Sequence, residues 1–355
     1  MKIKFKSTEK IGNILLYLGI PRLLKSVQLK PSWANIRVTE NCNSRCITCY
    51  AWKNNSQNEL TTEEMKDALH QLWDVGVRNL IFVGGEPLLR PDIGELIKEA
   101  SSVGFENIIV VTNGLLLERK AEELVHSGVT HVTVSIDGFK STNDEIRGIP
   151  GSYETSIKGI KAVQKAIKRT GRDVAITILT TILLEKNFRD IPKLIEVARH
   201  LGVYWSFNLL DPNLDIFKGI PFSELLVKDE KIVDETIDYI KRVHKRFPRL
   251  IYTCNHMLEY ARSYLKGKKR YNFHCVHGFK MIYLGAHGEV YPGCWIMEPL
   301  GNIRRNKLSD LVGSKRHKEI AQKMYMMKCP GCTNRYEVNV SIKHLLSHSL
   351  FCQRK

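Results

Sequence analysis

Three cysteines lie close together near the start of the chain. Cys42, Cys46 and Cys49 have the spacing C-x3-C-x2-C and follow a strand-like run at residues 35–39. Three thiolates on one short loop suit a metal that accepts soft sulfur ligands. A structural zinc takes four protein ligands, so zinc would need a fourth residue from elsewhere. A [4Fe–4S] cube held by three cysteines instead keeps one iron open for another ligand.

A second set of cysteines lies toward the end of the chain. It consists of Cys275, Cys294, Cys329 and Cys332. Two are isolated and two form C-x2-C, so together they make a complete four-thiolate set. Ligand chemistry alone allows either a zinc ion or a fully ligated iron–sulfur cluster there. Cys352, in the tail, is predicted to be unliganded.

Polar and glycine-rich motifs recur where predicted strands end. Gly84, Gly85, Glu86 and Pro87 follow the apolar run 80–83. The carbonyl groups of this turn and the Glu86 carboxylate can bind an ammonium group.

Two more strand ends carry such groups. Thr112 and Asn113 follow the run 108–111, and Ser135 and Asp137 end the run 131–136. Each pair alone is typical of ordinary turns. Their repetition at successive strand ends predicts a ligand site, with Ser135 and Asp137 able to reach hydroxyl or carboxylate groups.

The elements that must position these motifs alternate between strand and helix. Predicted strands cover 35–39, 80–83, 108–111, 131–136, 174–179 and 204–209. Apolar residues at helical spacing lie between them, and Thr61 with Glu64 forms a predicted capping box. Near-continuous apolar strands separated by helices indicate a parallel sheet with both faces covered. We predict an α/β fold, a partial (β/α)6 TIM-type barrel, with its site at the carboxyl ends of the strands.

The predicted domain organisation has five parts. They are an N-terminal helical extension at 1–33, the barrel at 34–235, a basic helical bridge at 236–270, a small α+β cysteine-rich domain at 271–335 and a tail at 336–355. The apolar pattern of the extension predicts a helix that plugs the bottom of the barrel, or alternatively a helix that contacts a membrane surface.

Composition restricts the class of protein. The chain has 355 residues, no apolar run of membrane-spanning length and no signal-peptide pattern, and its clustered cysteines suggest a reducing compartment. We therefore predict a cytoplasmic protein. The net charge of +17 favours anionic partners. No motif that alternates aromatic and basic residues suggests a stable nucleic-acid partner.

Residues 34–210 resemble the radical S-adenosylmethionine (SAM) enzymes. Cys42, Cys46 and Cys49 match the cysteine triad of that family, and residues 84–87 match its methionine-binding turn. Ser135 and Asp137 match its cofactor-contacting positions. The family often has an aromatic residue before the third cysteine, where this chain has Thr48, so Tyr50 is the candidate to shield the cofactor. The resemblance implies a [4Fe–4S] cluster with SAM on its open iron, and cleavage of SAM to a 5′-deoxyadenosyl radical.

The C-terminal cysteines resemble the SPASM domain, and more closely its short twitch form. This resemblance implies one auxiliary [4Fe–4S] cluster, with a zinc ribbon as the alternative. A one-electron donor such as flavodoxin or ferredoxin is implied as well. Cys254 is predicted to be a buried thiol, or alternatively a hydrogen-atom donor. Further candidates for catalytic groups are Glu259, His274 and His277.

The resulting hypothesis is an enzyme that abstracts a hydrogen atom from a small or carrier-linked polar substrate. Dehydrogenation, epimerisation or rearrangement would follow. A maturase of a ribosomally made peptide is the first alternative, although only about 33 residues precede the barrel where such enzymes often carry a peptide-binding domain. A zinc-binding scaffold protein is the non-enzymatic alternative.

Overall fold

The computed structural model describes residues 30–54, 56–182, 184–210, 219, 222–253, 255–267 and 275–329. Several predictions fall outside these ranges. They concern the helices of the N-terminal extension, Cys254, His274, Cys332, Cys352 and the C-terminal tail.

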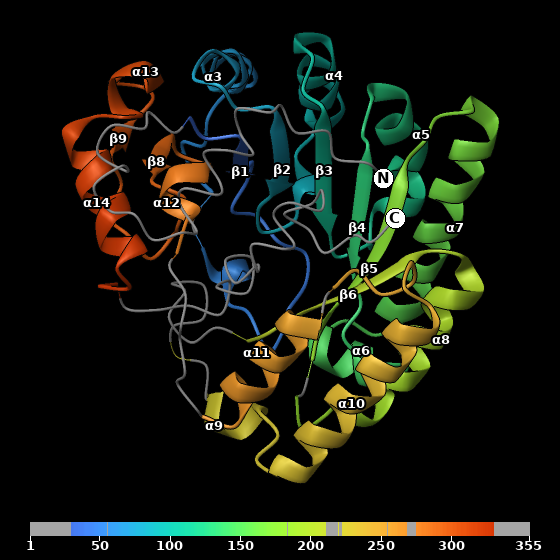
Figure 1. Cartoon of the computed structure of the whole chain (residues 1–355). Helices are drawn as coiled ribbons and strands as arrows, with labels where there is room; N and C mark the ends of the chain where they lie inside the picture. The colour runs from blue at the N-terminus through green and yellow to red at the C-terminus, as the bar shows by residue number, and fades with distance from the viewer. Residues whose placement is uncertain are drawn as a thin grey trace.

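Within the described residues the strands form one nine-stranded sheet, in the order β6-β5-β4-β3-β2-β1-β7-β8-β9 (Figure 1). The strands are β1 (Trp33–Arg37), β2 (Asn79–Val83), β3 (Asn107–Thr112), β4 (His131–Ser135), β5 (Ala175–Thr181), β6 (Tyr204–Asn208), β7 (Met281–Leu284), β8 (Glu289–Tyr291) and β9 (Gly301–Asn302). Strands β1 to β6 pair in parallel with their sequence neighbours, as the alternating pattern predicts. The sheet curves without closing, which confirms the partial barrel.

Helices follow the barrel strands. They are α3 (Thr62–Asp74), α4 (Ile93–Val103), α5 (Leu117–Ser127), α6 (Ser141–Arg147), α7 (Ser152–Thr170) and α8 (Ile191–Leu201). The predicted capping box is present, because the Thr61 side chain accepts a hydrogen bond from Glu64 N and the Glu64 side chain accepts one from Thr61 N. Such a box satisfies two backbone donors at the start of α3. The short helix α6 was not predicted, because its single apolar residue, Ile146, gives no apolar periodicity.

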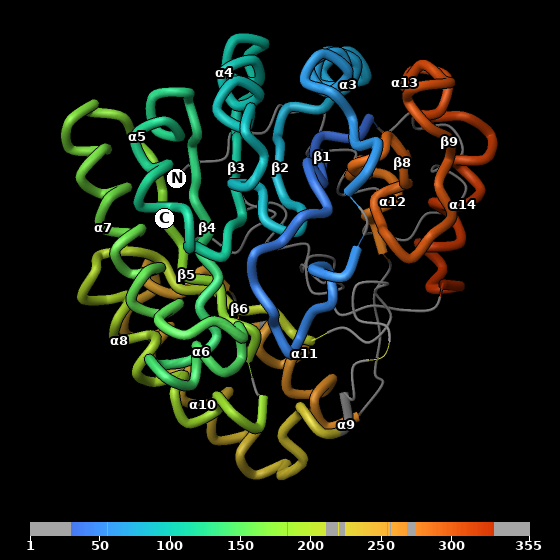
Figure 2. Tube along the Cα trace, turned by 180° about the vertical axis from the view of Figure 1, so that it is seen from behind, coloured from blue at the N-terminus to red at the C-terminus, as the bar shows by residue number. Residues whose placement is uncertain are grey.

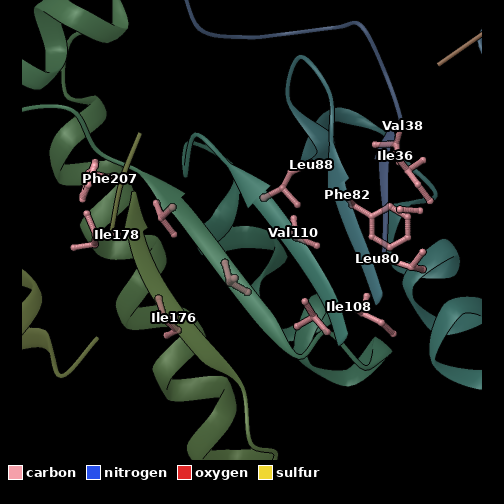
Figure 3. Packing of buried hydrophobic residues seen from close by; sticks show 14 of the residues in the cluster. Ile36, Val38, Leu80, Phe82, Leu88, Ile108, Val110, Ile176, Ile178 and Phe207 are labelled. Carbon is pink, nitrogen blue, oxygen red and sulfur yellow. The ribbon is translucent and has the colours of Figure 1, made fainter. Parts of the chain in front are cut away.

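The main core lies between the sheet and these helices. Ile36, Phe82 and Val110 are fully buried and point from their strands toward the helical layer (Figure 3). Strand side chains alternate between faces, so Trp33, Asn35 and Arg37 belong to the opposite, inner face. A second apolar cluster forms on that face around Trp33, Met281 and Tyr283. The inner face is therefore partly filled by residues from the C-terminal part of the chain.

The C-terminal part continues the barrel sheet. It contains α12 (His277–Lys280), β7, β8, β9, α13 (Leu308–Leu311) and α14 (Lys315–Tyr325). Strand β7 pairs in parallel with β1, and the predicted hairpin of β7 and β8 is present. Figure 2 shows α13 beside α3. The boundary at residue 271 stays a prediction, since strands from both sides of it belong to one sheet.

A hydrogen-bonded contact fixes this part against the barrel. The Arg304 guanidinium donates to both carboxylate oxygens of Glu64, at 2.7 and 2.8 Å, and to the carbonyl oxygen of Asn58 at 2.9 Å. These hydrogen bonds lower the pKa of Glu64 to about 2. Bidentate pairs of this kind restrict geometry as well as adding energy.

Helices occupy much of the segment assigned to the basic bridge, whose boundaries stay a prediction. It contains α10 (Glu230–Arg246) and α11 (Asn255–Leu265), which pack together, and the short α9 (Phe222–Leu225) precedes them. After α10 the chain returns to the edge of the sheet, where Tyr252 N donates to Trp205 O at 2.7 Å. Among the described residues, no helix has the length and apolar character that crossing a membrane requires.

Candidate functional site

The three cysteines of the first loop line one cavity of about 300 Å³. Its other walls come from the carboxyl ends of the strands, including Glu86, Asn113, Ser135 and Asp137. The loop is fixed to the end of α6 by two backbone hydrogen bonds, Arg45 N to Arg147 O at 3.0 Å and Ile47 N to Ile146 O at 2.9 Å. The cavity volume is at the lower end of the range for small-ligand pockets, about 300–1,000 Å³.

Burial in the cavity favours the protonated form of the three thiols when no metal is bound. Burial raises the pKa of Cys42 to about 11 and that of Cys49 to about 12, and it also raises the pKa of Cys46. A bound metal reverses this preference, because a coordinating thiol is deprotonated outright. The site therefore fits a cationic iron–sulfur group better than free thiolates.

Only glycine fits at positions 84 and 85, because the backbone of residues 39–41 lies too close for a side chain. A Cβ atom on Gly85 would lie 2.2 Å from the carbonyl oxygen of Asn41, and one on Gly84 would lie 2.5 Å from Thr39 O. The same close approach is held by Gly85 N donating to Thr39 O at 2.8 Å and Glu86 N donating to Asn41 O at 2.7 Å. Because the glycines have no side chain, the start of the cysteine loop can pack directly against the end of β2.

The carboxylate of Glu86 is more structural than the sequence suggested. It is 1% exposed and accepts hydrogen bonds from Leu88 N, Thr112 Oγ1 and Asn113 N, at 3.0, 2.6 and 2.7 Å. Burial raises the pKa of Glu86. Asn113 continues this link, because its amide donates to Asn43 Oδ1 at 2.7 Å. Glu86 therefore joins the ends of β2 and β3, which in turn support the cysteine loop.

Asp137 has a buried partner that sequence reasoning missed. Its Oδ2 atom lies 2.8 Å from Arg147 Nη2, and its Oδ1 atom accepts a hydrogen bond from Thr181 N at 2.7 Å. The paired carboxylate still lines the cavity, and its contact with a cofactor hydroxyl stays a prediction. Arg147 lies at the end of the unpredicted α6, and no local signal in the sequence singles it out.

Arg147 places a positive charge beside the cysteines. Its side chain is 14% exposed, and its Nη1 atom lies 3.8 Å from Cys46 Sγ. Its Nε atom is buried and has no hydrogen-bond partner among the described residues. Since Arg147 also lines the cavity, it offers a donor to an anionic group bound there.

One aromatic ring near the cysteine loop lines the cavity, and it belongs to Trp52. Tyr50 is not among the lining residues; it packs edge-on against Trp52 and has the Lys53 ammonium 3.8 Å from its ring centroid. Shielding of a cofactor by Tyr50 stays a prediction. Pro87 is also not among the lining residues, and it begins a single 3-10 turn at Pro87–Leu89.

The second cysteine group is described in part. Cys275 is buried before α12, Cys294 follows β8, and Cys329 follows α14. Gly293 has φ 73°, and a Cβ atom there would lie 2.4 Å from His277 O. The chain must therefore turn tightly in front of Cys294, close to α12. Cys332 is outside the described residues, so the four-cysteine set stays a prediction.

Glu259 does not belong to the cavity. It is exposed on α11, where it forms ion pairs with Lys241 at 2.6 Å and with Arg262 at 3.3 Å. Its carboxylate links α10 and α11, so in this structure Glu259 is a surface ion-pair residue, and a catalytic role for it stays a prediction. His277 is buried in the first turn of α12, beside the second cysteine group.

Replacing Glu86 by alanine is expected to lower both stability and affinity for SAM. Three hydrogen-bond donors would lose their acceptor, and each buried unsatisfied group costs about 1–3 kcal/mol. Urea unfolding and equilibrium SAM binding measure the two effects, and Glu86→Gln is the control because it keeps one carbonyl acceptor. Unchanged stability of the alanine variant would contradict the structural role.

Comparisons with known proteins agree with this geometry. Residues 36–198 match the radical SAM superfamily, and residues 275–333 match SPASM, an iron–sulfur cluster-binding domain. Together the two matches cover more than half of the chain. The protein belongs to the radical SAM superfamily and is an enzyme of that class with a C-terminal iron–sulfur domain. The radical SAM domain implies a [4Fe–4S] cluster and SAM as cofactors, and the second domain implies an auxiliary iron–sulfur cluster.

Particular relatives differ in what they do. An AdoMet-dependent heme synthase of Methanosarcina barkeri is 29% identical over 292 residues, which is 77% of this chain and 80% of the relative. A GTP 3′,8-cyclase of Marinobacter nauticus is 29% identical over 226 residues, 61% of this chain and 64% of the relative.

Solved structures share the fold. SuiB of Streptococcus suis, bound to its precursor peptide SuiA, has a TM-score of 0.67 at 16% identity and covers 85% of this chain and 69% of its own. The AdoMet-bound anSMEcpe has a TM-score of 0.63 at 19% identity. The likeness covers 91% of this chain and 94% of anSMEcpe. At such identities the likeness establishes the fold alone.

Proposed function

We propose that Cys42, Cys46 and Cys49 hold the SAM-binding [4Fe–4S] cluster and that SAM occupies the adjoining cavity. The observation that carries this assignment is one cavity lined by all three cysteines, of which Cys46 is buried and Cys42 and Cys49 are half-buried, and by the Asp137–Arg147 pair. When bound, the cluster and SAM supply a 5′-deoxyadenosyl radical that takes a hydrogen atom from the substrate.

The chain's own residues would position and protect these groups. The buried Nε atom of Arg147 supplies a charge-assisted hydrogen bond to the carboxylate of SAM. Gly84 and Gly85 line the cavity and would offer carbonyl groups to the ammonium, and Ser135 would supply a hydroxyl from the end of β4. Trp52 and the apolar side chains of Val83 and Leu179 limit the entry of water.

The inner face of the sheet supports a polar substrate with a flat part. Arg37 lies on β1 with its guanidinium 4.4 Å from the ring centroid of Trp295, and its Nη1 atom is paired with Glu40 at 3.1 Å. Tyr283 and Tyr291 pack on the same indole at 4.9 and 5.2 Å between centroids. An aromatic wall beside an Arg–Glu pair suits a small or carrier-linked substrate that has both a flat part and polar groups. Its reaction would be a dehydrogenation, an epimerisation or a rearrangement.

An anaerobic turnover assay tests this function. Reconstituted enzyme, dithionite and SAM are incubated with fractions of host extract separated into small molecules and peptides, and mass changes are recorded together with 5′-deoxyadenosine. We expect a change in the small-molecule fraction. A change confined to peptides would favour the maturase alternative, and absence of 5′-deoxyadenosine in every fraction would contradict the assignment.

Iron analysis tests the second cysteine group. If Cys275, Cys294, Cys329 and Cys332 bind a [4Fe–4S] cluster, the purified protein should contain about eight irons per chain, four for each thiolate group. A variant lacking Cys42, Cys46 and Cys49 should retain about half of that iron and a brown chromophore that SAM does not perturb. A colourless variant containing about one zinc per chain would instead identify a zinc ribbon.

A further inference from the structure

A basic segment covers the last turns of helix α10 and the turn that follows it. Residues 241–249 read Lys-Arg-Val-His-Lys-Arg-Phe-Pro-Arg, with five Lys or Arg and no Asp or Glu. Lys241 is paired with Glu259. Arg242, Lys245, Arg246 and Arg249 are exposed and form no ion pair with the residues that the structure describes. Most of the positive charge of this segment is therefore not balanced by carboxylates of the described residues.

Cations from other elements converge on the same place. A cavity of about 1230 Å³ opens at the amino-terminal ends of β3 to β6, and Arg246, Phe247 and Arg249 line it. Lys168 of α7 lines it as well, as does Arg199 of α8, which is paired with Glu196 at 2.6 Å. The carboxylates of Glu106 and Asp173 are also present. Cations still outnumber carboxylates, so the rim of this cavity favours an anionic partner.

An exposed aromatic ring stands among these cations. Phe247 is 36% exposed, and it and Met326 are the exposed large apolar side chains of the described chain. The Arg246 guanidinium lies 5.1 Å from the centroid of the Phe247 ring. An apolar ring flanked by long basic side chains suits a lipid interface, because the ring enters the acyl boundary while the cations reach the headgroups.

We propose that the amino-terminal end of the barrel docks on an anionic lipid surface through this cationic rim, formed by Lys168, Arg242, Lys245, Arg246, Phe247 and Arg249. The proposal is independent of the function proposed for the cysteine cavity. That cavity lies at the carboxyl ends of the strands, so docking at the opposite end leaves it uncovered.

One further observation favours lipid over nucleic acid. Binding a nucleic-acid strand typically uses several aromatic rings along a groove. Phe247 is the exposed large aromatic side chain among the described residues of the rim.

Vesicle sedimentation of the full-length holoenzyme tests the proposal. We expect binding to vesicles of equimolar phosphatidylcholine and phosphatidylglycerol, little binding to phosphatidylcholine alone, and weakening by salt. Each cation near an anionic surface contributes about fivefold in affinity, so Arg246→Gln with Arg249→Gln should weaken binding about 30-fold. Arg242→Gln with Lys245→Gln is a second pair with a similar expected loss. Phe247→Ser should weaken binding while keeping its salt dependence.

Matched controls lie on α14 and just beyond it. Lys315 and Lys323 are exposed, without an ion pair to any described residue, and Met326 is 51% exposed. Lys315→Gln with Lys323→Gln, and separately Met326→Ser, should leave vesicle binding unchanged. Circular dichroism and iron content identical to those of the wild type show that each variant is folded.

Several results would overturn the proposal. They are no binding of the wild type to the anionic vesicles, an equal loss in the α14 controls, or binding that survives both rim pairs, which would assign the contact to another part of the chain such as residues 1–29. Rim-dependent binding of a single-stranded oligonucleotide without vesicle binding would indicate nucleic acid instead. Rim-dependent self-association in sedimentation velocity, without vesicle binding, would indicate a second copy of the chain.

Discussion

Replacing Cys42, Cys46 or Cys49 by alanine is expected to abolish SAM cleavage. A cube that keeps only two protein ligands while one iron is reserved for SAM is not expected to persist. The structure adds that the three positions line one cavity with the strand ends, so no nearby described cysteine can replace a missing one. Anaerobic 5′-deoxyadenosine formation with dithionite measures the effect.

The matched control for this series is Cys329→Ala. It removes a cysteine of the second group and should leave at least part of the SAM cleavage intact, because Cys329 follows α14, outside the cavity. Wild-type amounts of 5′-deoxyadenosine from any of the three first-loop variants would refute the assignment of the cluster to this loop.

Replacing Arg147 by leucine is expected to produce the second large effect. The substitution leaves the Asp137 carboxylate, which is 2% exposed, without its cation. Removing one partner of a buried pair costs about 3 kcal/mol or more in stability. The loss of a charge-assisted hydrogen bond to SAM should weaken its binding about tenfold to a hundredfold.

Two further variants separate these roles of Arg147. Arg147→Lys keeps the charge and should retain most of the stability, but it loses the planar donor group and part of the SAM affinity. Combining Arg147→Leu with Asp137→Leu removes the unpaired carboxylate, so stability should recover while SAM affinity stays low. Recovery of SAM affinity in the double variant would show that Arg147 acts only as a partner for Asp137.

Much of the fold was predictable because its signals are local. A strand between two covering layers is continuously apolar, and a helix repeats every 3.6 residues, so the six βα units are visible without knowledge of their partners. The capping box at Thr61 and the Asp229 side chain that caps α10 act within a single helical turn. The C-x3-C-x2-C loop is equally local, since its ligands lie on one short segment.

The pairing of side chains within the site was not predictable. Arg147 and Cys46 are separated by 101 positions and meet only because α6 is hydrogen-bonded to the cysteine loop. Tyr50 and Trp52 are both aromatic residues within three positions of Cys49, so the sequence does not show which ring lines the cavity. The turn after Cys49 places Trp52 there. The ion pairs of Glu259 were not predictable either. Its pair with Lys241 depends on the packing of α10 on α11, and its pair with Arg262 lies within α11.

The sequence by itself determined the order of strands and helices, the cysteine loop and the strand ends that surround it. Tertiary structure alone decided that β7 lies beside β1, that Glu86 joins β2 to β3, and that Asp137 is neutralised by Arg147. The physical reason is the range of the forces involved. Periodicity and capping act within a few residues, whereas the partners of a buried polar group depend on which distant segments the folded chain brings together.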